Sequence, residues 1–158
     1  MKKIIVSERI WRETWDGLRS RGRGIRESAC VWGGQRSEKM DVVNSVIFLD
    51  DLHGVSAGAR YHRMSRDSIL ALFKILKSNK QVIIADIHTH PSSWVDLSLT
   101  DRESPIEYRP GLPAMVLPHY ACTAPDLKTI GLHEYKGDGL WEQFEIENIS
   151  TVVKIMEA

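Results

Sequence analysis

Residues 81–101, QVIIADIHTHPSSWVDLSLTD, join a dense apolar strand to a polar segment that follows it directly. Residues 81–88 are too apolar for a half-exposed edge strand, so we expect them at the centre of a sheet. His88 and His90 lie two residues apart at the end of this strand, and their side chains therefore leave the same face. Pro91 then ends the ladder and turns the chain away, which exposes both imidazoles at the strand's carboxyl end.

The same stretch contains a set of residues that can bind a divalent metal. His88, His90 and Asp101 supply two imidazoles and one carboxylate, and they leave a fourth position open, as in catalytic zinc sites. Imidazole and carboxylate ligands favour zinc, which lowers the pKa of a bound water to about 7. We therefore expect one Zn²⁺ per chain. Three nearby acids remain alternative ligands on the sequence alone: Asp86, Asp96 and Glu103.

Hydrolysis at such a metal also needs a group that carries a proton and a donor for the developing oxyanion. Ser98 offers a hydroxyl close to the expected ligands. Glu27 heads an apolar strand that ends in two glycines, and it is the best candidate for the proton-carrying carboxylate. Glu27 and Ser98 are therefore the predicted catalytic residues.

Working outward, the pattern predicts one α+β domain over residues 1–158, a central mixed β-sheet flanked by helices. Ser7 and Ser65 are expected N-caps of the first two helices, and Gly33-Gly34 is expected to close the strand that starts at Glu27. The second helix should bury one apolar stripe, made of Ile69, Leu70, Leu72, Phe73 and Leu76. Strands are expected at 2–6 (an edge strand), 27–32, 41–49, 60–64, 114–117, 129–135 and 140–146; helices at 8–18, 65–78 and 149–156; a loop at 50–58; and a short helix or turn at 99–107.

Composition excludes several classes of protein. Lys plus Arg equals Asp plus Glu at 21 each, so we expect neither nucleic acid nor an anionic membrane as a partner. Residues 18–26 carry four arginines and no acid, either as a solvated helix end or as a docking patch. No apolar run is long enough for a membrane span or signal peptide, which predicts a cytoplasmic protein. Cys30 and Cys122 are expected to be buried free thiols. The sequence leaves the oligomeric state open.

The metal motif resembles that of the JAMM metalloproteases, also called JAB or MPN-domain proteins, whose pattern is an upstream Glu followed by H-x-H-x7-S-x-x-D. Residues 27–34 (ESACVWGG) are similar to the family's glutamate strand, and residues 113–118 (PAMVLP) to the strand after the metal site in prokaryotic JAB proteins. The resemblance covers residues 27–117 and implies a mixed sheet flanked by helices. It also implies that zinc is bound by the two histidines and the aspartate, that the serine stabilises the oxyanion, and that the glutamate acts as general base and then acid.

The chain further resembles the standalone JAB deconjugating peptidases of antiphage operons, such as CBASS or bacterial ubiquitin-like systems. This resemblance implies a deubiquitinase-like isopeptidase or peptidase that cleaves after the C-terminal tail of a ubiquitin-like or otherwise conjugated protein, in antiviral defence. Such an extended tail would bind by strand addition beside the site. Trp94 and residues 50–61 are candidate walls for it.

The sequence is also compatible with features of four other classes of protein. Residues 86–90 (DIHTH) also resemble the first strand of amidohydrolase and PHP-type barrels, but the 68 residues after His90 are too few for such a barrel. Some MPN domains are non-catalytic scaffolds, whereas this chain keeps every ligand position. A DNA-associated JAB protein of the RadC type would use the arginine cluster. A cysteine hydrolase would use Cys122 with His119, although no separate acid is evident to orient the histidine.

Overall fold

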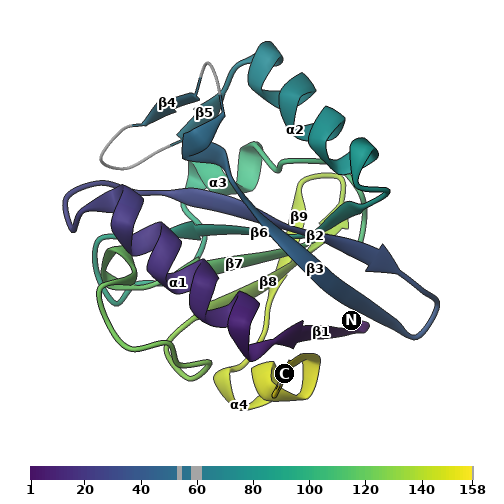
Figure 1. Cartoon of the computed structure of the whole chain (residues 1–158). Coiled ribbons are helices and arrows are strands. Elements are labelled where there is room, and N and C mark those ends of the chain that lie inside the picture. Colours follow the sequence, from purple (N-terminus) through teal and green to yellow (C-terminus); the bar gives the residue numbers. More distant parts are fainter. Residues whose placement is uncertain (53–54, 58–61, 158) are drawn as a thin grey trace.

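The computed structural model of the protein describes residues 1–52, 55–57 and 62–157, and an eight-stranded mixed sheet organises it (Figure 1). The strand order is β10-β1-β3-β2-β6-β7-β8-β9. Parallel pairs join β1 to β10, β1 to β3 and β6 to β7, and the other neighbours are antiparallel. The strands are β1 (Lys3–Ser7), β2 (Ala29–Arg36), β3 (Met40–Phe48), β6 (Val82–Thr89), β7 (Pro113–Leu117), β8 (Gly131–Gly137), β9 (Leu140–Gln143) and β10 (Val153–Met156); β4 (Val55–Ala57) and β5 (His62–Met64) form a separate pair.

Helices cover both faces of the sheet, which confirms the expected α+β class. The helices are α1 (Glu8–Gly22), α2 (Arg66–Ser78), α3 (Leu99–Glu103) and α4 (Ile146–Val152), with short 3-10 turns η1 (Leu49–Asp51) and η2 (His119–Ala121). Helix α1 crosses one face, with Trp15 and Leu18 in the main core, and α4 lies near β1 at the same end of the molecule (Figure 1). Helix α2 covers the opposite face, where Leu72 and Leu76 pack with Val31 and Ile83.

The two predicted N-caps are confirmed. Ser7 accepts a hydrogen bond from the Ile10 amide at 3.2 Å, and Ser65 accepts one from the Ser68 amide at 3.1 Å. Each cap satisfies an amide of the first turn that has no partner within its helix. The cap residue and its partner are only three positions apart, so sequence alone was enough to locate both helix starts.

Strand β2 differs from the prediction because it continues through Gly33-Gly34 to Arg36. The register shifts between Gly33 and Gly34 against β3, and between Trp32 and Gly33 against β6. A side chain at Gly34 would overlap the carbonyl oxygen of Val42. The glycines therefore permit bulges and a close approach between backbones within the strand, and they do not end it.

Both ends of the chain also differ from the prediction. β1 is not an edge strand, because it lies between β3 and β10. The helix predicted over 149–156 is wrong in its second half: α4 ends at Val152, and Val153 pairs with Ile4 at the start of β10. Val153 is 1% exposed there, so burial against the sheet outweighs the helical pattern of the segment.

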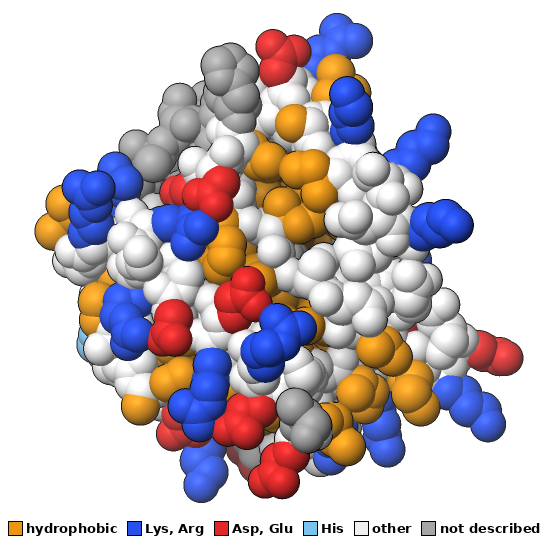
Figure 2. All heavy atoms as spheres, in the orientation of Figure 1, with side chains coloured by type: hydrophobic (Ala, Val, Ile, Leu, Met, Phe, Trp, Pro, Cys, Tyr) orange, Lys and Arg blue, Asp and Glu red, His pale blue; other side chains and the backbone are white. Residues whose placement is uncertain are grey.

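The apolar stripe predicted for α2 is only partly buried. Leu72 and Leu76 are buried, whereas Ile69, Leu70 and Phe73 are between 37% and 58% exposed. The helix packs on the sheet along a narrow line, which leaves its flanks in solvent. Figure 2 shows hydrophobic side chains gathered in this part of the surface, while Lys and Arg elsewhere on that face stand among Asp and Glu.

Smaller differences concern element ends. The helix expected within 99–107 covers only α3, and the strands expected at 129–135 and 140–146 are shifted to β8 and shortened to β9. The predicted brief strand at 60–64 is found as β5, although positions 60 and 61 lie outside the described residues, as do 53, 54 and 58 of the expected loop.

The two cysteines differ in burial. Cys30 is buried, as expected, but Cys122 is exposed, so the prediction of a buried thiol is wrong there.

Within the part of the chain that the structure describes, no helix combines the length and apolarity that a membrane span requires.

Candidate metal centre

The carboxyl end of β6 carries the two histidines, and this strand lies between β2 and β7. His88 pairs with Ala29 of β2 and with Val116 of β7, so its backbone is held from both sides. His90 follows directly after the strand, where its amide donates to the carbonyl of Leu117 at 2.9 Å. The predicted central position of this strand is confirmed, and it places both imidazoles on a rigid support.

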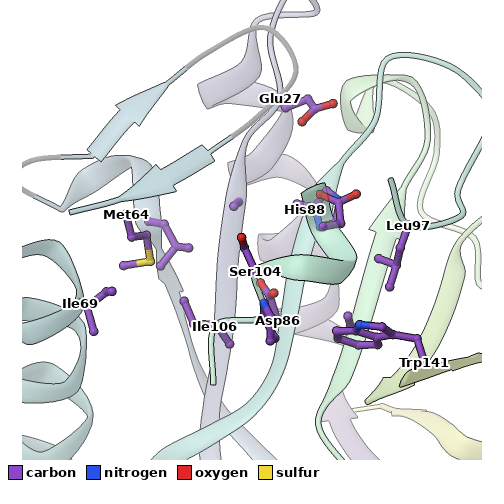
Figure 3. Close-up of a pocket in the computed structure, with 14 residues that line it drawn as sticks. Glu27, Met64, Ile69, Asp86, His88, Leu97, Ser104, Ile106 and Trp141 are labelled. Atoms are coloured by element: carbon purple, nitrogen blue, oxygen red, sulfur yellow. The ribbon is translucent and has the colours of Figure 1, made fainter. Parts of the chain in front are cut away.

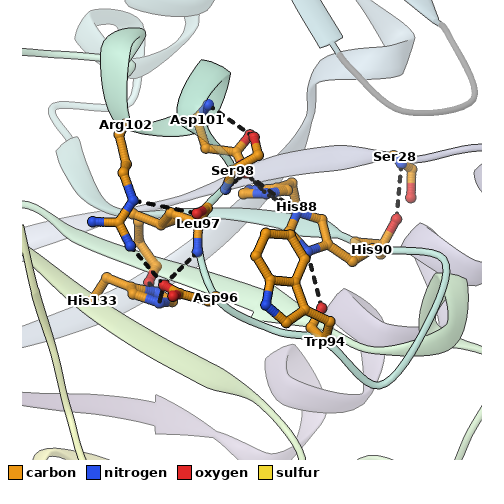
Figure 4. Close-up of polar contacts among 12 residues, drawn as sticks. Ser28, His88, His90, Trp94, Asp96, Leu97, Ser98, Asp101, Arg102 and His133 are labelled. Carbon is orange, nitrogen blue, oxygen red and sulfur yellow. Dashed lines mark hydrogen bonds and ion pairs between the residues drawn. The ribbon is translucent and has the colours of Figure 1, made fainter.

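Three atoms converge at this point (Figure 4). His88 Nε2 lies 3.1 Å from His90 Nε2, and each of these nitrogens lies 3.2 Å from Asp101 Oδ2. The side chain of His90 is 4% exposed, and the side chains of His88 and Asp101 are 13% and 11% exposed. The structure thus brings together the ligand atoms of the three residues that were predicted to bind the metal.

Asp101 reaches this point because α3 begins beside the site. Ser98 caps the helix: its hydroxyl oxygen accepts from the Asp101 amide at 3.1 Å, and its own amide donates to Asp101 Oδ2 at 2.8 Å. This reciprocal pair is a capping box. The four-residue spacing S-L-T-D therefore has a local structural cause, and it fixes the carboxylate oxygen that faces the imidazoles.

Trp94 determines how the His90 ring is oriented. The carbonyl oxygen of Trp94 lies 3.0 Å from His90 Nδ1, so that nitrogen carries the proton and Nε2 keeps its lone pair. The indole also stacks on the imidazole, with centroids 5.1 Å apart and planes inclined by 11°. The indole itself is 53% exposed, so it forms an outer wall of the site.

The charges of the site shift the pKa values of its members in opposite directions. Burial would raise the pKa of Asp101, but the hydrogen bond from His88 and the charge of that imidazole hold it well below its ordinary value. Burial would lower the pKa of His88, and the Asp101 carboxylate outweighs it, so the pKa is raised. Burial raises the pKa of Asp86 to about 6; the charge of Asp101 adds to this rise, and His88 opposes it.

Glu27 lies in the same cavity as His88 and Asp101 and is 5% exposed (Figure 3). It precedes β2, and the next residue anchors it: the Ser28 amide donates to Thr89 Oγ1 at 3.0 Å, and the Thr89 amide donates to the Ser28 carbonyl at 3.0 Å. Thr89 stands between the two histidines. The position of Glu27 is thus tied directly to the segment that carries the metal ligands.

Sequence reasoning missed several residues that hold the site in place. Ser28 and Thr89 are both fully buried, and the only signal for Thr89 was its position between two residues that face the other way. Asp96 pairs with Arg102 at 2.9 Å, and its carboxylate lies 3.3 Å from His133 Nε2, so it connects the loop before Ser98 to α3 and β8. The contacts of Thr89 with Ser28 and of Asp96 with His133 join segments far apart in the chain, so no local pattern predicts them.

A left-handed turn supports His90 from behind. His119, Tyr120 and Ala121 have φ values of 52°, 55° and 60°, and the Tyr120 amide donates to the His90 carbonyl at 2.8 Å. Each non-glycine residue in this conformation costs roughly 1 kcal/mol, and such strain is concentrated at functional sites. No glycine lies in this turn, so no local pattern predicts its left-handed conformation.

The donor set fits a divalent metal. Two imidazole nitrogens and one carboxylate oxygen point at a common centre, and the His90 tautomer leaves a lone pair directed there. Among the described residues, His88, His90 and Asp101 form the one group whose ligand atoms lie within 4.8 Å of one another. Asp96 is instead paired with Arg102, and Glu103 is exposed, so neither alternative ligand joins the group.

The arginine cluster and Cys122, which were also candidates for function, make contacts with other residues of the chain. Arg21 of the arginine cluster pairs with Asp51 and lies over the Phe48 ring, and Arg19 pairs with Asp16. The Cys122 thiol donates to the Tyr120 carbonyl at 3.8 Å.

A search against models of protein families finds no match. Among solved structures, the chain is similar to the protein DSY2949 from Desulfitobacterium hafniense, with a TM-score of 0.70 and 19% identity over 98% of this chain and 94% of that one. A weaker likeness, with a TM-score of 0.49 and 16% identity over 92% and 95% of the two chains, is to AF2198, a JAB1/MPN domain protein from Archaeoglobus fulgidus. The likeness to the Desulfitobacterium protein extends over nearly the whole of both chains and concerns their common fold.

Proposed function

We propose that the protein is a zinc-dependent peptidase or isopeptidase of the JAMM (JAB/MPN) type. The observation that carries this proposal is the convergence of His88 Nε2, His90 Nε2 and Asp101 Oδ2 within 3.2 Å, beside a cavity that also holds Glu27. Three protein ligands with an open side are the arrangement of catalytic zinc sites, whereas structural sites use four.

When bound, Zn²⁺ supplies a Lewis acid for the scissile carbonyl and lowers the pKa of a water molecule. Glu27 accepts a proton from the attacking water and returns it to the leaving amine, and its buried position keeps bulk water from competing. Ser98 Oγ already accepts from the Asp101 amide, so its own hydroxyl proton is free to donate to the developing oxyanion.

The substrate is a ubiquitin-like or otherwise conjugated protein, cleaved after an extended C-terminal tail in a deubiquitinase-like reaction. The resemblance to JAB peptidases of antiphage operons supports this class and a role in antiviral defence in the cytoplasm. The exposed indole of Trp94 beside the ligands offers a flat apolar surface for such a tail.

Two measurements on one set of variants test the proposal. Native mass spectrometry should find one zinc per chain in the purified protein and none in His88→Ala. The zinc-loaded protein should cleave a ubiquitin-type domain joined through its C-terminal glycine to a lysine peptide. Glu27→Gln should keep the zinc and lose at least about a hundredfold in turnover.

Glu103→Gln is the matched control, because this exposed glutamate lies outside the ligand group. It should retain both zinc and turnover. A wild-type chain that stays empty when zinc is offered would instead favour a non-catalytic MPN-type scaffold. Normal turnover by Glu27→Gln would refute the role given to this glutamate.

A further inference from the structure

A cavity of about 300 Å³ extends from the metal ligands along the face of the sheet that α2 covers. Glu27 lies at one end of it and Asp86 toward the other, with His88 between them (Figure 3). Asp86 and His88 are two residues apart on β6, so both side chains point into the same space. A group bound at Asp86 would therefore lie next to the reacting centre.

The walls of the cavity around Asp86 are largely apolar. Met64 and Ile69 line one side and Trp141 lines the opposite side (Figure 3), and Leu49 and Ile106 also belong to the lining. The indole of Trp141 is held in place, because its Nε1 donates to the Arg102 carbonyl at 3.1 Å. These surfaces favour a long hydrocarbon chain over a small polar one.

Asp86 differs from two other partly buried acids because no Lys or Arg among the described residues pairs with it; the nearby charge that lowers its pKa is that of His88, which gives up its proton when it binds a metal. Asp41 pairs with Lys2, and Asp96 pairs with Arg102. By contrast, no side chain among the described residues forms a hydrogen bond or an ion pair with the Asp86 carboxylate. The backbone amide of Ile87 donates a hydrogen bond to it. Asp86 also lies outside the group that could hold the metal.

A half-buried carboxylate without a Lys or Arg partner costs free energy, and such groups are found where a ligand completes them. We propose that this cavity binds a lysine or arginine side chain of the substrate close to the scissile bond, with Asp86 as the residue that selects it. The hydrocarbon stem packs on the apolar walls, and the cationic end forms a charge-assisted hydrogen bond with the carboxylate. This inference rests on the proposed hydrolysis and adds a substrate class to it.

Peptides with one changed side chain provide the test. One set of hexapeptides of glycine and alanine carries a single arginine at each position in turn, and a matched set carries citrulline, which has the same shape without the charge. Cleavage by the zinc-loaded protein is followed by mass spectrometry. Binding to zinc-loaded Glu27→Gln is followed through the amide resonances of Ile87 and Ile106.

At one position, arginine should exceed citrulline by at least about tenfold in kcat/KM and in affinity. Asp86→Asn should remove this preference with zinc content unchanged and with amide shifts confined to the neighbours of position 86, and Asp86→Glu, which keeps the charge, should retain it. If arginine peptides bind in this Asp86-dependent way but neither they nor the conjugated ubiquitin-type domain is cleaved, the cavity assignment stands and the proposed hydrolysis fails. Equal treatment of arginine and citrulline at every position, or an arginine preference that survives in Asp86→Asn, would overturn the assignment.

Discussion

Thr89 shows how one side chain outside the motif positions the site. Its neighbours His88 and His90 face the metal position, while its own hydroxyl accepts the Ser28 amide at 3.0 Å. Thr89→Val keeps the shape and leaves that buried amide without an acceptor, which costs about 1–3 kcal/mol. We expect the free energy of unfolding to fall by this amount. We also expect turnover to fall more than zinc content, because the lost hydrogen bond holds Ser28, the residue next to Glu27.

Thr89→Ser is the control for this prediction, since it keeps the hydroxyl. It should restore most of the turnover, although it loses one buried methyl group. Urea unfolding, zinc counting and turnover on all three proteins make the comparison. Equal turnover in the valine and serine variants would show that this hydrogen bond does not position the glutamate.

The His88–Asp101 pair predicts how the metal-free protein responds to pH. The pKa of Asp101 is lowered from 3.8, so its stabilising contribution is present above that value and is lost as the pH falls below it. The pKa of His88 is raised from 6.5, so its contribution is present below 6.5 and is lost as the pH rises through the raised value.

The pair should therefore stabilise the metal-free protein most between pH 3.8 and 6.5. Urea unfolding of the chelated wild type and of chelated His88→Gln should differ most in that window, and the difference should shrink above it. Zinc competes with the proton for His88, so zinc affinity should fall as the pH falls. A stability difference that grows toward alkaline pH would contradict this account.

At the scale of elements, the start of β8 packs against the loop that leads to Ser98 and Asp101. A methyl group at Gly131 would overlap the carbonyl oxygen of Val95, which lies between Trp94 and Ser98. Gly131→Ala should displace this loop, with a loss of about 1–3 kcal/mol in stability. We also expect weaker zinc binding, because the same loop leads into α3 and Asp101, and calorimetric zinc titration would measure it.

Gly22→Ala, at the end of α1, is a suitable comparison. Its added methyl group would lie 3.6 Å from Ser28 Oγ, an ordinary contact, so we expect stability and zinc affinity close to those of the wild type. If both alanine variants bind zinc normally, contact between β8 and the loop is not needed to form the site.

At the scale of the whole molecule, β10 closes one edge of the sheet far from the metal position. Val153 is 1% exposed, and its full burial contributes about 1.5–3 kcal/mol. A chain that ends at Val152 should therefore lose at least that stability and expose β1 as an edge. Zinc affinity of the folded fraction should be unchanged, because β1, β3 and β2 separate β10 from β6.

Chemical denaturation and zinc titration of this shortened chain, beside a control that ends at Met156, check both expectations. The control keeps β10 entire and should match the wild type. Unchanged stability of the shorter chain would mean that β10 contributes little to the core, and lost zinc binding in its folded fraction would show that the two ends of the sheet are coupled.

The features that the sequence determined by itself are those with short-range causes. The caps at Ser7 and Ser65 and the capping box at Ser98 each join residues three positions apart, so a short stretch of sequence contains both partners. His88 and His90 share a face because side chains alternate along a strand, and the apolar density of β6 required its central place. These local rules were enough to predict the three candidate metal ligands from the sequence.

Tertiary structure alone decided what depends on partners far away in the chain. It placed β1 inside the sheet, turned the end of the expected last helix into β10, and left Ile69, Leu70 and Phe73 of α2 partly in solvent. It also joined Ser28 to Thr89 and left Asp86 facing a cavity with no Lys or Arg beside it among the described residues. The physical reason is that strand pairing and burial are set by the free energy of the whole fold, and a side chain's partners depend on which segments that fold brings beside it.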